Sequence, residues 1–176
     1  MALSPDMKNL INNIAKEVLN IYNISVPICN IDEVVHKMGG IVIEDPELDS
    51  FSDGKIRKTG KNQFEIVVSP FQTVERKNFT IAHELGHLFL HMGFLVDDAR
   101  WKLQDNKTYY RNGNSAFEYQ SNEFAAAFLM PKEEYKAIMD KYTEDTTVYT
   151  AEIARYFHVS TEAASNRGKW LGYLEW

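Results

Sequence analysis

The sequence has one cysteine among its 176 residues, Cys29, so no disulfide bond can form within the chain. Structural disulfides belong to oxidising compartments, and their absence favours a reducing one. The chain also lacks an apolar run of the roughly 20 residues that a membrane-spanning helix requires. Near the N-terminus Lys8, Asn12 and Lys16 interrupt the apolar residues, so we expect no signal peptide. We therefore predict a cytoplasmic protein that does not bind membranes.

Positive charge is scarce as well. The 19 Lys and Arg residues face 25 Asp and Glu residues, which gives a net charge of -6. This balance disfavours a protein whose main partner is nucleic acid. The hydrophobic content of 44% is enough for a core, and the length suits one domain over residues 1–176. We expect residues 1 to about 149 to carry helices, a sheet and a metal site. A helical subregion over about 150–176 should pack on them.

The segment 78–91 contains the pattern His-Glu-x-x-His, formed by His83, Glu84 and His87. In a helix the two histidines share one face, about 6 Å apart along the axis, so both imidazoles can converge on one metal ion. Glu84 is rotated by about 100° from His83, where it flanks the ion and can accept a proton from water. A structural histidine pair is the alternative, and the apolar surroundings argue against it. Gly86 predicts close approach of a strand or a substrate.

A catalytic zinc site usually has three protein ligands and one open position for water. His91 continues the helical spacing, but about 12 Å along the axis separates it from His83, so one zinc cannot bind both. It is better interpreted as a residue behind the ligands, on the substrate side, or at the helix end. Glu118 begins a later predicted helix and is the preferred third ligand, with Glu123 as an alternative. Asn122 is predicted to hydrogen-bond to a ligand histidine.

Apolar periodicity and capping residues predict the other helices and strands. One helix is expected over 116–129, and others are expected to follow the N-cap residues Ser4, Asn30, Thr73, Thr150 and Ser160. Strands at 41–43 and 64–68 predict a small antiparallel sheet. We expect 64–68 to be its exposed edge, where a peptide substrate would add as a further strand. Residues 94–116 either cover the cleft or form a surface insertion.

Two segments of the sequence resemble the ImmA/IrrE family of metallo-endopeptidases. Residues 79–87 read FTIAHELGH and residues 118–131 read EYQSNEFAAAFLMP. The corresponding family patterns are F-T-x-A-H-E-L-G-H and E-x-x-A-N-x-F-A-A-x-L-L-M-P. Ser121 replaces a usual alanine and Phe128 a usual leucine. Weaker similarity extends to Arg167 near the end of the chain.

The resemblance implies zinc ligands at His83, His87 and Glu118 and a catalytic base at Glu84. It implies an α+β fold with a zincin-like core, a small antiparallel sheet, an active-site helix and a C-terminal segment that resembles a helix-turn-helix. It further implies a cytoplasmic zinc endopeptidase that cleaves a helix-turn-helix repressor of a phage, a mobile element, or a stress or toxin–antitoxin system. Because no N-terminal DNA-binding domain of the kind fused to some relatives is recognisable, we expect a stand-alone protease.

Some assignments stay open at this stage. Candidates for a second donor to the oxyanion are His91, Tyr109, Tyr110 and Tyr119. The alternative function is a zinc-binding regulatory or DNA-binding module without proteolytic activity, because residues 150–171 have helix-turn-helix spacing. The charges over 151–176 cancel, and a phosphate-binding helix should be basic, so we expect this segment to pack on the protease core instead. The oligomeric state is not readable.

Overall fold

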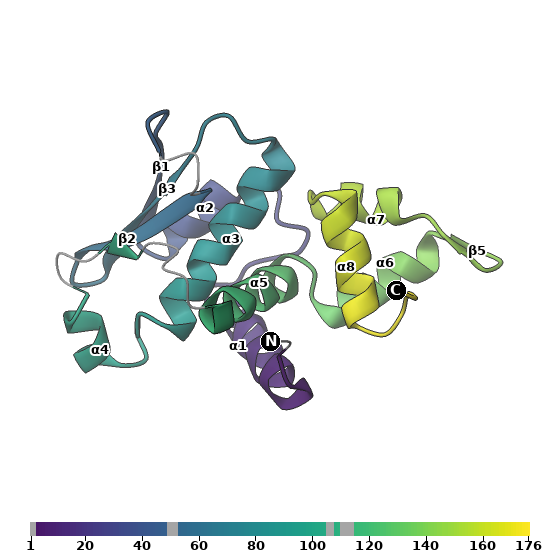
Figure 1. Cartoon of the computed structure of the whole chain (residues 1–176), viewed down its shortest axis with the longest axis horizontal. Coiled ribbons are helices and arrows are strands. Elements are labelled where there is room, and N and C mark those ends of the chain that lie inside the picture. The colour runs from purple at the N-terminus through teal and green to yellow at the C-terminus, as the bar shows by residue number, and fades with distance from the viewer. Residues whose placement is uncertain (1–2, 49–52, 105–107, 110–114) are drawn as a thin grey trace.

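The computed structural model describes residues 3–48, 53–104, 108–109 and 115–176. Figure 1 shows the sheet on one side, helices α3 and α5 crossing in the middle, and α6 to α8 on the other side. This arrangement confirms the α+β class. The described elements are α1 (Pro5–Ile21), α2 (Ile31–Lys37), β1 (Gly40–Glu44), β2 (Gly54–Gly60), β3 (Gln63–Val68), α3 (Val74–Leu90), α4 (Asp98–Lys102), β4 (Thr108–Tyr109), α5 (Ser115–Leu129), α6 (Lys132–Lys141), β5 (Thr143–Glu144), β6 (Thr147–Val148), α7 (Thr150–Phe157) and α8 (Thr161–Trp170).

Most helices begin where a polar side chain caps them. Thr73 accepts a hydrogen bond from the backbone N–H of Arg76 at the start of α3, and Ser4, Asn30 and Ser160 act in the same way on α1, α2 and α8. Such a bond satisfies one of the amide groups that the first helical turn leaves unpaired. The prediction for Thr150 is wrong, because Thr150 is the first residue of α7 and Tyr149 occupies the cap position. None of the helices in the described ranges has both the length and the apolar character that crossing a lipid bilayer requires.

The sheet is mixed, so the prediction of an antiparallel sheet is wrong in part. Its strand order is β1-β3-β2-β4, with β1 parallel to β3 and the other two pairs antiparallel. Residues 64–68 belong to β3, which lies between β1 and β2 and is not an edge. All five of these residues are buried. Near-continuous burial is typical of a strand covered on both faces, whereas β1 is largely exposed.

Helices α3 and α5 cross with almost no space between their backbones. A Cβ atom added to Gly86 would lie 2.9 Å from the Cα atom and 3.1 Å from the carbonyl oxygen of Ser121. Only glycine permits this approach. Gly86 therefore does allow close packing, but its neighbour is a helix and not the predicted strand or substrate. The Ser121 Oγ atom is buried at this crossing and has no hydrogen-bond partner among the described residues.

A buried arginine joins the C-terminal helices to the rest of the molecule. Arg167 on α8 is 2% exposed, and its guanidinium lies 3.1 Å from the Glu123 carboxylate on α5. The same guanidinium donates to the Met130 carbonyl at 3.0 Å and to Asn12 Oδ1 on α1 at 2.7 Å. Burial lowers the pKa of Arg167, and the Glu123 charge opposes this shift. Three helices therefore meet at one charged group.

The segment after α3 is partly packed against the sheet. Trp101 on α4 is buried, its ring contacts Phe94 edge-on, and its Nε1–H donates to the Lys61 carbonyl at 2.5 Å. Further on, β4 pairs with β2. Residues 98–102 thus form a short helix that packs against the sheet side of the molecule. Residues 105–107 and 110–114 lie outside the described part of the chain.

Arg167→Met should lower the free energy of unfolding by about 3–5 kcal/mol, because it leaves the largely buried Glu123 carboxylate without its cationic partner. Urea unfolding followed by tryptophan fluorescence measures the change. The control is Arg155→Ala, which removes an exposed ion pair with Glu152 and should cost less than about 1 kcal/mol. Equal losses in the two variants would contradict the importance of the buried pair.

Ser121→Ala should raise the free energy of unfolding of the metal-free protein by about 1 kcal/mol, because it removes a buried hydroxyl that lacks a partner. Ser160→Ala is the matched control, and its effect on the free energy of unfolding should have the opposite sign. It removes an N-cap and should lower the free energy of unfolding by about 1 kcal/mol. Thermal melts of both variants test the pair. A lower melting temperature for Ser121→Ala would show that its hydroxyl is satisfied in the folded protein.

Candidate metal centre

His83 and His87 lie one turn apart on α3, and both side chains are buried. Their Nε2 atoms are 3.1 Å apart. Glu118, on the first turn of α5, places its Oε2 atom 3.2 Å from His83 Nε2 and its Oε1 atom 3.5 Å from His87 Nε2. The predicted third ligand thus comes from a different helix, and the α3–α5 crossing brings it to the histidines.

The spacing of these three groups fits a tetrahedral zinc ion. Ligand atoms bound to zinc at 2.0–2.2 Å and at tetrahedral angles stand about 3.3–3.5 Å from one another. The three observed distances, 3.1, 3.2 and 3.5 Å, lie close to this range. His83, His87 and Glu118 also form a group of potential metal ligands within the described residues. Two neutral imidazoles and one carboxylate are donors that zinc accepts.

The competing candidate, Glu123, does not join this group. It lies on α5 five residues after Glu118, and its Oε1 atom accepts from Arg167 at 3.1 Å and from Asn12 Nδ2 at 2.6 Å. Five residues turn a helix through about 500°, so Glu118 and Glu123 point in different directions. Residue chemistry did not separate the two glutamates, but their surroundings do.

Glu84 lies beside the first residue of β2. Its side chain is buried, and a Cβ atom added to Gly54 would lie 3.2 Å from Glu84 Oε1 and 2.7 Å from Thr80 Cγ2. A larger residue at position 54 would therefore press against the carboxylate. The start of β2 thus forms one wall of the space in which Glu84 lies, a contact that the sequence did not predict.

Polar side chains contact the far nitrogen atoms of both histidines. Asn122 Oδ1 lies 2.8 Å from His83 Nδ1, as the sequence predicted. His91 Nδ1 lies 3.0 Å from His87 Nδ1, and His91 Nε2 lies 2.9 Å from Gln120 Oε1. Burial lowers the pKa of His91, and its hydrogen bond to the Gln120 carbonyl oxygen opposes this shift. Sequence reasoning missed Gln120, because nothing in its residue type or spacing distinguishes it from a surface glutamine.

The four predicted oxyanion donors differ in where they lie. His91 is hydrogen-bonded to Gln120 and to the Nδ1 atom of His87, so it lies on the side of the His87 ring that faces away from Nε2. Tyr119 is 47% exposed on α5. Tyr109 belongs to β4, and Tyr110 lies outside the described residues. The assignment of this donor stays a prediction.

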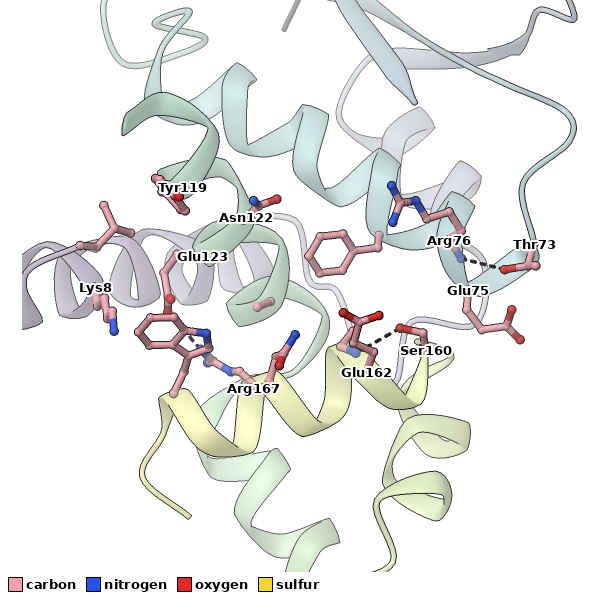
Figure 2. A pocket seen from close by; sticks show the side chains of 16 residues that line it. Lys8, Thr73, Glu75, Arg76, Tyr119, Asn122, Glu123, Ser160, Glu162 and Arg167 are labelled. Carbon is pink, nitrogen blue, oxygen red and sulfur yellow. Dashed lines mark hydrogen bonds and ion pairs between the residues drawn. The ribbon is translucent and has the colours of Figure 1, made fainter. Parts of the chain in front are cut away.

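A pocket of about 690 Å³ lies between helices α1, α3, α5 and α8 (Figure 2). Asn122 forms part of its wall, together with Tyr119 and Glu123 from α5 and Arg167 from α8. Asn122 thus separates the pocket from His83, to which it is hydrogen-bonded. Asn122 therefore contacts both the pocket and one member of the ligand group.

Both motifs, residues 79–87 and 118–131, lie within a longer stretch that matches a known protein family. Residues 40–169 match the family model described as peptidase M78, IrrE N-terminal-like domain. A solved structure of a Mycobacterium tuberculosis transcriptional regulator is similar in fold, with a TM-score of 0.60 and 17% sequence identity over 92% of this chain. The chain spans 48% of the length of that regulator. No curated sequence is similar enough to be counted as a relative.

The purified chain should hold about one zinc ion when it has three ligands of this kind. His83→Ala, His87→Ala and Glu118→Ala should each lose most of it, because two remaining ligands bind weakly. Glu123→Gln should keep its zinc, since that carboxylate faces Arg167. Elemental analysis after dialysis measures the content. Normal zinc in Glu118→Ala would remove this residue from the ligand set.

Proposed function

The chain belongs to the peptidase M78 family of IrrE N-terminal-like domains, and on this basis we propose that it is a zinc-dependent endopeptidase. The observation that carries the proposal is the convergence of His83 Nε2, His87 Nε2 and the Glu118 carboxylate at spacings suited to zinc. His83, His87 and Glu118 would hold the ion. Glu84 would act as the general base.

Zinc held by these residues would lower the pKa of water toward about 7 and polarise the carbonyl of a peptide bond. Glu84 takes a proton from water and later delivers it to the leaving amine. Its neighbours support this assignment. Burial against Gly54 and Thr80 limits the positions that the carboxylate can adopt, and positioning of this kind contributes to catalysis. Asn122 orients His83 through its Nδ1 atom.

We propose a protein substrate, and specifically a helix-turn-helix repressor, as the resemblance to ImmA/IrrE proteins implies. Binding of DNA by this chain is not part of the proposal. Arg155, Arg167 and Lys169 are the cations of residues 150–176, and Arg167 is buried against Glu123. The cations left at the surface are too few for a strong phosphate contact. The single cysteine favours a cytoplasmic location, which stays a prediction. The organisation as one domain with two subregions that meet near residue 150 also stays a prediction.

Glu84→Gln tests the function most directly. Glutamine keeps the size of the side chain but cannot accept the proton at neutral pH. Cleavage of the repressor encoded beside the gene should fall by roughly 10²–10⁴-fold, while zinc content and melting temperature stay nearly unchanged. The measurement is the rate of appearance of repressor fragments on gels, with the cleavage site determined by mass spectrometry.

The matched control is Glu75→Gln, an exposed glutamate in the first turn of the same helix, and it should cleave at the wild-type rate. Wild-type cleavage by Glu84→Gln would remove this residue from the mechanism. If the wild-type protein binds the repressor without cutting it, and Glu84→Gln does the same, the chain is a zinc-dependent binding module.

A further inference from the structure

His91 lies where it can control the chemistry of one metal ligand. It is the C-cap residue of α3, four residues after His87, and it is 7% exposed. Its ring stacks on Phe117 of α5 with 4.3 Å between centroids and 18° between planes. Hydrogen-bond contacts to His87 and to Gln120 occupy its two nitrogen atoms. Neighbouring residues therefore fix the position of the His91 ring, its plane and the contacts of both its nitrogen atoms.

We propose that Gln120 and His91 form a hydrogen-bonded relay that holds His87 in the tautomer required for metal binding. The proposal rests on the zinc site proposed above, and it gives His91 and Gln120 a positioning function. Neither residue would bind the metal or the substrate.

The direction of each hydrogen bond follows from the one before it. If His87 Nε2 offers its lone pair to a metal, the proton of the neutral ring is on Nδ1, so His87 donates to His91 Nδ1. His91 Nδ1 must then be unprotonated, and the proton of His91 is on Nε2. This Nε2–H requires an acceptor, which is the Gln120 carbonyl oxygen at 2.9 Å.

The opposite orientation of the Gln120 amide would reverse the relay. An amide N–H directed at His91 Nε2 would place the His91 proton on Nδ1 and make it a donor to His87 Nδ1. The His87 proton would then be on Nε2, where it blocks metal binding. Only one sense of the relay is compatible with a metal at His87, and the structure has that sense.

The other candidate ligand, His83, has a comparable contact at its Nδ1 atom. Asn122 Oδ1 accepts from His83 Nδ1 at 2.8 Å, which leaves the Nε2 lone pair of His83 directed at the same point. Gln120 and Asn122 both belong to α5, which also carries Glu118. One helix thus supplies the third ligand and sets the tautomers of the other two.

Zinc affinity measured by competition with a chelator tests the relay. Asparagine and leucine have nearly the same shape, and Asn Oδ1 lies close to where His Nδ1 lies. His91→Leu removes the acceptor and should weaken zinc binding by about 10–100-fold, whereas His91→Asn keeps an acceptor for His87 and should weaken zinc binding by a smaller factor than His91→Leu. Gln120→Leu should also weaken zinc binding, by about 10-fold, and Gln120→Glu, which keeps an acceptor oxygen, should not.

A direct readout of the tautomer uses the metal-free protein. Nitrogen-15 NMR should show the His87 proton on Nδ1 in the wild type and a mixture of tautomers in His91→Leu. Equal zinc affinity in His91→Leu and His91→Asn, or an unchanged His87 tautomer in His91→Leu, would overturn the relay. A wild-type chain that binds no zinc would instead overturn the proposed function, so the two failures are distinguishable.

Discussion

The contact between Gly86 and Ser121 is the constraint on which the candidate site depends. Gly86 lies between the two histidines on α3, and the absence of a side chain there lets the backbone of α5 come within van der Waals contact. At this separation the carboxylate of Glu118 reaches both imidazoles. A wider crossing would move the third ligand away from the other two, whatever the sequence around them.

The local features of this site were predictable because they depend on helical periodicity. The spacing of His83 and His87 and the cap at Thr73 follow from about 3.6 residues per turn and from capping chemistry. Asn122 was predicted to contact a ligand histidine because it lies one turn after Glu118, although His83, which donates to it, lies 39 residues away. The place of Glu118 at a helix start favoured it over Glu123, and the resemblance to a known family implied the same residue. Only the surroundings of Glu123 provide the physical reason.

The features that were missed depend on residues far apart in the chain. The parallel pairing of β1 with β3 depends on where the hairpin of β2 and β3 docks, and local patterns do not contain that information. The buried run from Phe64 to Val68 could have indicated a central strand. Gln120 acts only through His91, which is 29 residues away, so no spacing rule would have selected it. Gly54 beside Glu84 is a contact of the same kind.

Two consecutive residues of α5 contact different parts of the molecule, since Asn122 holds His83 and Glu123 holds Arg167 of α8. Metal binding and docking of the C-terminal helices therefore act on the same turn of one helix. An ion that binds the folded chain alone stabilises it by about 2.7 kcal/mol at a hundred times its dissociation constant. Thermodynamic linkage is reciprocal. If metal binding strengthens the docking of α8 by a given factor, then loss of that docking weakens metal binding by the same factor. An Arg167 substitution that displaces this turn would thus weaken metal binding, although this arginine contacts none of the three candidate ligands in the described structure.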